Sequence, residues 1–365
     1  MSSGEVSAAQ ARAIRKWKFL FDSAYQADAS AFSGWISSYS GRPIAQPEME
    51  EWLEGTVGRI LARRPRRVLE IGCGTGLIVR RVAPLVERYC GVDISARAIE
   101  QLVGSPGVAA AIDQSIDLRC AAAHEVGSLF APGFDLVILN SVIQYFTDRD
   151  YLDAVLAQAI ALSLPGGALF VGDIRNAALA DSFVASVALA RAEPAATVEE
   201  LRQSALALAA ADGELQIAPQ DVRRLASRLP RVGAVDLLLK PGMADNELTR
   251  FRYDAILHLD EAPAPPDADT LRWGDLPDGL DGLERRLLDA PGRALKVCGI
   301  GNARLGSALS ARAHISGLPR LGGSQEQPAA FEALARRLGF AVSLMPGEDR
   351  PESFDALFAP ASPAA

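Results

Sequence analysis

The stretch Val68-Leu69-Glu70-Ile71-Gly72-Cys73-Gly74-Thr75-Gly76, followed by Tyr89-Cys90-Gly91-Val92-Asp93, decides the fold of this chain. It reads as an apolar strand, a glycine turn, a helix and a second strand that ends in a carboxylate. Three glycines at alternate positions let the backbone pass close to a ligand where a Cβ would collide. Asp93 follows Gly76 by 17 residues, where an acidic side chain can bind both hydroxyls of a ribose.

The spacing of the glycines separates this loop from the dinucleotide fingerprint, which has two residues between its second and third glycines. Here every gap is one residue, and the pattern E-x-G-x-G-x-G resembles motif I of class I S-adenosylmethionine (SAM) methyltransferases. The resemblance implies SAM as the cofactor. It implies that Glu70 orients the loop, that Gly72, Gly74 and Gly76 line the cofactor, and that Asp93 binds the ribose. A glycine-rich turn of another α/β protein is the structural alternative.

Composition excludes several classes of function. The net charge is −8 and no basic stripe occurs, which argues against a nucleic-acid partner. The four cysteines form no C-x-x-C pair and have no histidine at ligand spacing, so we expect no metal site. The N-terminus lacks a signal pattern and no run of 18 apolar residues occurs, so we expect a cytoplasmic protein without a membrane partner.

From Arg67 onward, strands and helices alternate regularly. Unbroken apolar runs such as Leu136–Leu139 are typical of strands buried on both faces. Two more strands, near 234–240 and 251–259, flank a hairpin-like connection and match the final antiparallel hairpin of methyltransferase sheets. We predict an α/β fold: a Rossmann-like doubly wound sheet with an antiparallel last strand, a helical lid and a small C-terminal α/β unit. The five earlier strands are expected at 67–71, 89–93, 116–120, 134–139 and 168–173, with helices near 76–86, 95–103 and 150–163.

Five regions lie outside this sheet: an N-terminal segment, a helical insertion, a linker, a C-terminal unit and a tail. Trp17, Phe21 and Tyr25 recur at a spacing of four and line one face of a helix. We expect Trp17, Phe21 and Trp52 to be core residues, and the hydroxyl-rich loop 32–39 to be a lid over the cofactor. The predicted boundaries are an N-terminal helical lid segment at 1–64, a SAM-binding core at 65–260 with a helical insertion at 177–230, a linker at 261–267, a C-terminal α/β subdomain at 268–358 and a disordered tail at 359–365.

Four further motifs make the resemblance more specific. They are similar to the methyltransferase domains embedded in the adenylation domains of nonribosomal peptide synthetases, in which carrier-bound aminoacyl groups are usually N-methylated and relatives methylate oxygen or carbon. Free-standing bacterial methionine S-methyltransferases, which act on the free amino acid, are also similar in size and type. The motifs are Phe32-Ser33-Gly34-Trp35, Asn140-Ser141-Val142-Ile143-Gln144-Tyr145-Phe146, Gly172-Asp173-Ile174-Arg175 and Asn246-Glu247-Leu248-Thr249-Arg250-Phe251-Arg252-Tyr253-Asp254.

One departure from that family concerns the adenine contact. The family commonly has an acidic pair just after the third strand, where this chain has Ala121-Ala122-Ala123-His124-Glu125. The acidic contact is therefore missing or displaced to Glu125. Asn140 ends the fourth strand, where ligands bind in open α/β sheets, so we expect it to bind the cofactor's amino group or to face the substrate. A helix cap is the alternative role for Asn140.

The remaining site candidates lie at strand ends and in loops. Arg175 or Arg250 offers a forked contact to a substrate carboxylate, a contact that a tethered thioester does not need. His124 is the candidate general base. An amine must lose a proton before it attacks, whereas a thioether carries none, so base chemistry separates N- from S-methylation. The catalytic candidates are His124, Tyr145 and Asp173, and the substrate-binding candidates are Tyr39, Gln144, Arg175, Glu247 and Arg250.

The sequence therefore predicts a SAM-dependent methyltransferase of small-molecule metabolism. Its acceptor is the sulfur or nitrogen of an amino acid, either free methionine or a carrier-bound aminoacyl group. Two alternatives stay open. One is O- or C-methylation of a carrier-bound peptide or polyketide intermediate, and the other is a non-catalytic SAM-binding protein that assists a synthetase.

Overall fold

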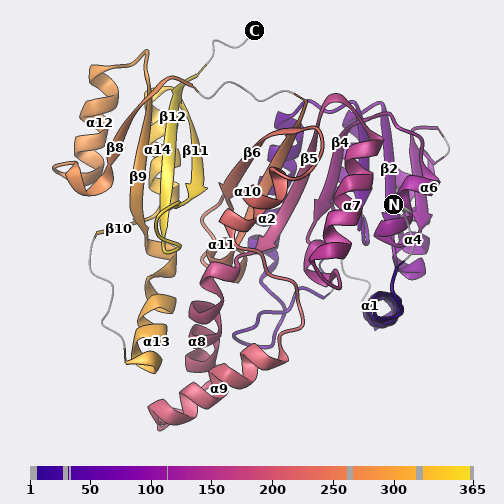
Figure 1. The fold of residues 1–365 in the computed structure, drawn as a ribbon, viewed down its shortest axis with the longest axis horizontal. Coiled ribbons are helices and arrows are strands. Elements are labelled where there is room, and N and C mark those ends of the chain that lie inside the picture. The colour runs from indigo at the N-terminus through magenta and orange to yellow at the C-terminus, as the bar shows by residue number, and fades with distance from the viewer. Residues whose placement is uncertain are drawn as a thin grey trace.

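The computed structural model describes residues 6–27, 32, 34–112, 114–260, 266–317 and 324–361. Its main element is a seven-stranded sheet of order β3-β2-β1-β4-β5-β7-β6 (Figure 1). Strands β1 to β5 pair in parallel, and β7 pairs antiparallel with both β5 and β6, which confirms the predicted fold class. The strands are β1 (Arg67–Ile71), β2 (Arg88–Asp93), β3 (Ile116–Cys120), β4 (Phe134–Asn140), β5 (Ser163–Arg175), β6 (Val232–Leu239) and β7 (Arg252–Leu259).

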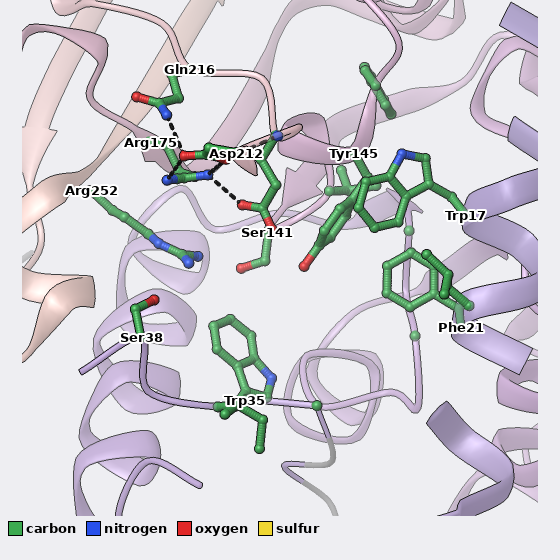
Figure 2. Close-up of a pocket in the computed structure, with 18 of the residues that line it drawn as sticks. Trp17, Phe21, Trp35, Ser38, Ser141, Tyr145, Arg175, Asp212, Gln216 and Arg252 are labelled. Atoms are coloured by element: carbon green, nitrogen blue, oxygen red, sulfur yellow. Dashed lines mark hydrogen bonds and ion pairs between the residues drawn. The ribbon is translucent and has the colours of Figure 1, made fainter. Parts of the chain in front are cut away.

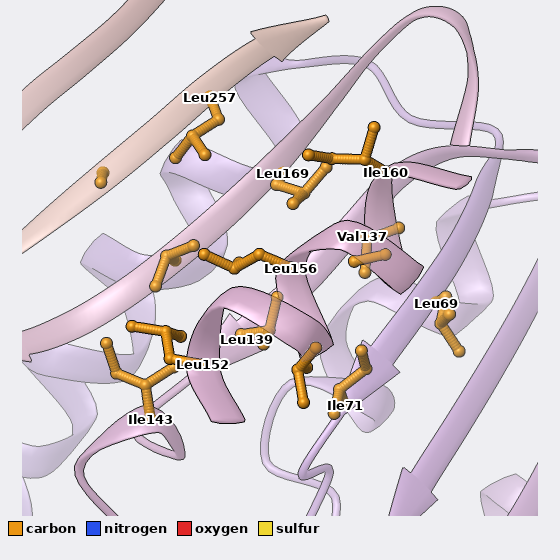
Figure 3. Packing of buried hydrophobic residues seen from close by; sticks show 14 of the residues in the cluster. Leu69, Ile71, Val137, Leu139, Ile143, Leu152, Leu156, Ile160, Leu169 and Leu257 are labelled. Atoms are coloured by element: carbon orange, nitrogen blue, oxygen red, sulfur yellow. The ribbon is translucent and has the colours of Figure 1, made fainter. Parts of the chain in front are cut away.

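Successive strand residues enter two different apolar cores, one on each face of the sheet. Leu69 and Val137 belong to the first core, whereas their neighbours Val68 and Ile138 belong to the second, as the two-residue period of a strand requires. Figure 3 shows the first core, where strand residues meet Leu156 of α7. The first core is closed by α6 (Val126–Leu129), α7 (Arg149–Leu162) and α10 (Pro219–Ala226), and the second by α2 (Gln46–Ala62), α3 (Val79–Val82), α4 (Ala96–Val103) and α5 (Pro106–Ala109).

The helix after the glycine loop is shorter than the expected segment near 76–86. Helix α3 ends at Val82, and a 3₁₀ turn follows at Ala83–Leu85. Pro84 lies in this turn, and proline cannot donate the backbone hydrogen bond that an α-helix needs there.

Helix α1 (Ala8–Ala27) crosses the carboxyl end of β2 and lies against α4 (Figure 1). Lys18 Nζ donates a hydrogen bond to the carbonyl of Ile94 at 2.8 Å, and Ser95 Oγ donates to Asp22 at 2.6 Å. These contacts hold the helix over the edge of the sheet where ligands bind in α/β folds. Within the described ranges, no helix combines the length and apolarity that a bilayer span requires.

The insertion between β5 and β6 contains α8 (Ala180–Arg191), α9 (Val198–Ala211) and α10. Helix α8 packs against α9 and against α13 (Gly306–Ser316) of the C-terminal region (Figure 1). Small side chains make this close approach possible, since Ala185 and Ala188 meet Ala311 in one buried cluster. Helix α11 (Glu247–Phe251) then connects β6 to β7.

A second sheet forms the C-terminal unit, with β8 and β12 on β9, and β11 on β12. Phe331, Phe354 and Phe358 fill its core, which also receives Leu239 from β6. The two sheets therefore share apolar packing. The elements are β8 (Ala268–Arg272), α12 (Gly279–Asp289), β9 (Ala294–Asn302), α13, β10 (Gln325–Glu326), α14 (Pro328–Leu338), β11 (Phe340–Pro346) and β12 (Ser353–Pro360).

Two boundaries of the C-terminal unit differ from the sequence-based expectation. Strand β12 continues through Pro360, two residues into the expected tail, because Ala359 and Pro360 pair with the start of β11. Strand β8 precedes the first expected helix and pairs in parallel with β9. Of the expected linker, residues 261–265 lie outside the described residues, as do residues 362–365 of the tail.

Candidate active site

A cavity of about 660 Å³ opens at the carboxyl ends of the central strands. This volume lies within the roughly 300–1,000 Å³ range of small-molecule sites. Its wall comes from α1, the loop before α2, the glycine loop, the segment after β4, and helices α8 and α9. In Figure 2, Tyr145 and Arg252 point into this space, with Trp17 and Phe21 on one side and Arg175 on the other.

Each glycine of the loop has a left-handed backbone, with φ of 83° at Gly72, 51° at Gly74 and 85° at Gly76. A Cβ at Gly72 would lie 2.5 Å from Val142 Cγ2, and one at Gly76 would collide with Leu102. A Cβ at Gly74 would face the Tyr25 hydroxyl at 3.3 Å beside the cavity. Packing therefore requires two of the glycines, while Gly74 keeps the cavity wall open to a ligand.

Asp93 lies on the cavity wall with both carboxylate oxygens fixed by the backbone. Its Oδ2 accepts a hydrogen bond from the Gly74 amide and its Oδ1 from the Ser95 amide, both at 2.8 Å. Burial raises the pKa of this carboxyl, and the two amides oppose that effect. The open glycine loop and this fixed carboxylate fit a ribose-bearing cofactor.

Glu70 lies behind the loop and does not line the cavity. Its Oε2 accepts a hydrogen bond from the Tyr89 hydroxyl at 2.6 Å, and burial raises the pKa of its carboxyl to about 8. This hydrogen bond links β1 to β2 beneath the loop. The role of Glu70 in orienting the loop stays a prediction.

An aromatic wall lines one side of the cavity, with Trp17 and Phe21 from α1 and Tyr145 from the segment after β4 (Figure 2). The ring centroid of Tyr145 lies 4.7 Å from that of Trp17 and 4.9 Å from that of Phe21. The expectation that Trp17 and Phe21 are core residues was wrong, because both line the cavity. Trp52, in contrast, is a core residue. Burial, together with the Glu214 carboxylate, raises the pKa of Tyr145 to about 12, so its hydroxyl keeps its proton at neutral pH.

Asp173 was predicted to be catalytic, but it is fully buried beneath the cavity wall. It accepts hydrogen bonds from Arg252 Nη1 at 2.5 Å, from Ser141 Oγ at 2.9 Å and from Trp52 Nε1 at 3.2 Å. Burial alone raises the pKa of a carboxyl, but Arg252 and Lys240 hold the pKa of Asp173 below its usual value. Asp173 thus positions Ser141 and Arg252, which do line the cavity.

Arg175 lines the cavity with its guanidinium already paired. It donates to both oxygens of Asp212 at 2.8 and 2.6 Å, and to Glu214 at 2.9 Å. Arg250 is paired with Asp245 at 2.7 and 2.8 Å and does not line the cavity. Both arginines that were predicted to bind a substrate carboxylate are therefore paired with acidic side chains of the chain itself.

Glu247 lines the cavity and anchors the loop that precedes α2. Its carboxylate accepts hydrogen bonds from the Ser38 amide and the Ser38 hydroxyl, both at 2.8 Å. Trp35 and Ser38 of that loop also line the cavity, as expected of a lid. Tyr39 lies outside the cavity wall, where its hydroxyl shares a hydrogen bond of 2.9 Å with Ser186 Oγ.

His124 does not line the cavity. Its Nδ1 shares a hydrogen bond of 3.0 Å with the hydroxyl of Tyr151, which does line the cavity. Glu125 folds back to accept from the Ala122 amide at 2.7 Å, so it does not replace the missing acidic contact. The predicted base and the displaced adenine contact are thus both absent from the described wall.

Asn140 and Gln144 are buried beneath the wall and do not line the cavity. The Asn140 amide donates to Ser141 Oγ at 3.2 Å, and the side-chain oxygens of both residues have no partner among the described residues. Sequence reasoning missed several residues that do line the cavity. Ser141 and Arg252 lay inside the quoted motifs, whereas Asp212 and Glu214 lie between α9 and α10 without a motif of their own.

Comparison with known proteins adds the following similarities. Residues 69–169 match the profile of a family described as a methyltransferase domain. The chain is 37% identical to chondramide synthase cmdD of Chondromyces crocatus over 82% of this chain and 8% of that protein. It is 38% identical to nonribosomal peptide synthetase dtxS1 of Metarhizium robertsii over 62% of this chain and 3% of that protein. The chain thus spans a small part of the length of these relatives.

Among solved structures, the N-methyltransferase NodS of Bradyrhizobium japonicum superposes with a TM-score of 0.42 at 18% identity, covering 59% of this chain and 98% of that chain.

Proposed function

Because the chain carries a SAM-dependent methyltransferase domain and resembles segments of nonribosomal peptide synthetases, we propose that it N-methylates an aminoacyl group whose carboxyl is tied up as a thioester. One observation carries the proposal. The cavity joins the cofactor loop to a polar wall that offers neither predicted arginine to a carboxylate, because Arg175 is paired with Asp212 and Arg250 does not line the cavity.

Gly72, Gly74 and Asp93 would hold the cofactor, with Glu70 behind the loop. Bound SAM supplies an electrophilic methyl group on a sulfonium, and the acceptor takes it by forming a new bond to carbon as the carbon–sulfur bond breaks, leaving S-adenosylhomocysteine. The aromatic wall of Trp17, Phe21 and Tyr145 suits a sulfonium, because aromatic faces attract cations.

The acceptor carbonyl has one donor group available on the wall. The Arg252 guanidinium is fixed by Asp173 through Nη1 and keeps further N–H groups, so it offers a directed hydrogen bond without further ordering. The Ser141 hydroxyl already donates its single proton to Asp173. A free amino acid would bring a carboxylate instead, and Arg175 already serves Asp212 and Glu214. The tethered acceptor therefore matches the wall better than free methionine does.

An amine acceptor must also lose a proton before it attacks the methyl group. Glu214 supplies a carboxylate on the cavity wall, close enough to Tyr145 to raise the pKa of that phenol. In the proposed step an ammonium proton passes to Glu214, the freed lone pair forms the nitrogen–carbon bond, and the product leaves as a protonated secondary amine. A thioether acceptor would have no use for this carboxylate.

The test offers the purified protein SAM together with alanyl-N-acetylcysteamine thioester, and separately each of the twenty free amino acids. We expect S-adenosylhomocysteine to form with the thioester, and a product heavier by one methyl group on nitrogen. Turnover of free methionine to a permanently charged sulfonium, with no reaction of the thioester, would overturn the proposal. Binding of SAM without any turnover would instead favour a non-catalytic role.

A further inference from the structure

Helix α8 presents two different faces to its surroundings. One face carries Ala185 and Ala188 and packs against α9 and α13. The other carries Phe183 and Val187, which line the cavity at helical spacing. Val184 lies between the two faces, because it lines the cavity and also packs against the buried cluster. This cavity-facing stripe is apolar up to Val187. Arg191, at the end of the helix, also lines the cavity and donates a hydrogen bond to the Ser38 carbonyl at 2.7 Å.

The end of α9 extends this apolar surface. Leu208 and Ala211 line the same cavity, and Phe251 of α11 packs its ring 5.1 Å from that of Phe183. The surface is therefore built by the helical insertion and is separate from the glycine loop that holds the cofactor.

This apolar surface adjoins the polar wall where the acceptor amine is proposed to react. The Arg175 guanidinium lies 5.6 Å from the ring centroid of Phe183, and Ala211 directly precedes Asp212. A group attached to the carbon next to the amine would therefore meet α8.

We propose that the α8 surface, defined as Phe183, Val184, Val187, Leu208 and Ala211, binds the side chain of the acceptor amino acid and selects aliphatic or aromatic side chains. The inference rests on the proposed N-methylation and names the substrate class for it. A charged side chain would lose its water against these residues without gaining a partner, which disfavours it strongly.

The test compares N-acetylcysteamine thioesters of valine, leucine and phenylalanine with those of aspartate and lysine. We expect kcat/KM to be about 10- to 100-fold higher for the apolar side chains, a range typical of one buried group in a pocket. Val184→Lys should then raise kcat/KM for the aspartyl thioester at least tenfold relative to kcat/KM for the valyl thioester. Leu189→Lys is the matched control, because Leu189 is an exposed residue of the same helix that does not line the cavity.

The outcomes separate this inference from the proposed function. Two results would overturn the side-chain assignment while leaving N-methylation intact. One is an equal kcat/KM for all five thioesters. The other is the same ratio of aspartyl to valyl kcat/KM in Val184→Lys and Leu189→Lys. Failure of the alanyl thioester as well would contradict the proposed function itself. If Val184→Lys loses SAM binding, Val184→Thr keeps the volume and should shift the ratio in the same direction by a smaller factor.

Discussion

Ser141 Oγ donates a hydrogen bond to Asp173 Oδ2 at 2.9 Å, and both residues have a left-handed backbone, with φ of 54° and 64°. Such a conformation is uncommon outside glycine and persists only when its surroundings hold it. Asp173 lies where the pairing of β5 with β7 shifts register, and bulges of this kind re-aim side chains next to active sites. The buried network thus fixes the ends of β4 and β5 beneath the cavity wall.

Asp173→Asn should destabilise the protein strongly. It leaves Arg252 and Lys240 near a neutral amide in a buried site, a change that typically costs about 3–5 kcal/mol. Asp245→Asn is the matched control, because Asp245 is 60% exposed and its pair with Arg250 should contribute below about 1 kcal/mol. Urea unfolding of both variants measures the difference, and equal losses would contradict a special role for the buried network.

Gly72→Ala should weaken SAM binding and lower stability by about 1–3 kcal/mol, because its Cβ would press on Val142. Gly41→Ala is the control, since Gly41 also has a positive φ but open space around its Cβ. Adding Val142→Ala to Gly72→Ala should restore part of the loss. Calorimetric titration with SAM measures the dissociation constant of all three variants. A wild-type dissociation constant for Gly72→Ala would show that Val142 leaves room for a Cβ at residue 72.

Glu70 should make stability depend on pH. Burial raises the pKa of its carboxyl to about 8, above the value of 4.5 expected in the unfolded chain. The folded state therefore keeps a proton that the unfolded state releases, so the contribution is full below pH 4.5 and is lost as the pH rises towards 8. The free energy of unfolding of wild type, relative to Glu70→Gln, should fall by up to about 1.4 kcal/mol per pH unit in this window.

Denaturant unfolding of the two proteins between pH 5 and pH 9 measures this slope. A difference between wild type and Glu70→Gln that stays constant over the range would show that Glu70 ionises normally in the folded protein.

Glu214→Gln should lower kcat/KM by roughly 10²–10⁴-fold, the range for loss of a general base. The SAM dissociation constant should stay near the wild-type value, since Glu214 is not part of the proposed cofactor contacts. Rates with the alanyl thioester between pH 6 and pH 10 check the role. We expect the activity of Glu214→Gln to recover partly at high pH, where the amine is deprotonated in solution. A pH profile identical in shape to that of wild type would contradict the role of Glu214 as the base.

His124→Asn should leave kcat/KM within about twofold of wild type, with an unchanged pH profile. Its ring contacts the Tyr151 hydroxyl and does not reach the cavity. This variant is the direct contrast to Glu214→Gln in the same assay. If the acidic limb of the pH–rate profile disappears in His124→Asn and not in Glu214→Gln, His124 is the base.

Local sequence patterns predicted the fold, and they marked Gly72, Gly74 and Asp93, which line the cavity. The glycine loop, β1 and β2 lie within 30 residues, so the pattern that marks them is local in sequence. The side chains that crowd Gly72 and Gly76 are Val142 and Leu102, which the pattern itself does not contain. The strand boundaries at β3 and β4 agree with expectation to within one residue, because apolar runs buried on both faces have a clear signature.

The part of the cavity wall away from the glycine loop was harder to predict, because its geometry depends on contacts between residues that are distant in sequence. Position after a strand does not tell where a side chain points, so His124 and Asp173 were assigned to a cavity that neither reaches. Arg175 meets Asp212 across 37 residues, and no local pattern marks that pairing. Trp17 and Phe21 show the same limit, since an apolar helix face fits a core and a cavity wall equally well.

Arg304 of the C-terminal unit donates hydrogen bonds to the backbone carbonyls of Lys240 and Gly242. The Lys240 ammonium in turn pairs with Asp254 at 2.9 Å, and Asp254 accepts a hydrogen bond from the Asp173 amide at 2.8 Å. The two sheets are therefore linked through one chain of buried contacts, so heating should melt them in a single cooperative transition. Calorimetry of Arg304→Ala should resolve that transition into two, with the C-terminal sheet melting independently of the catalytic one.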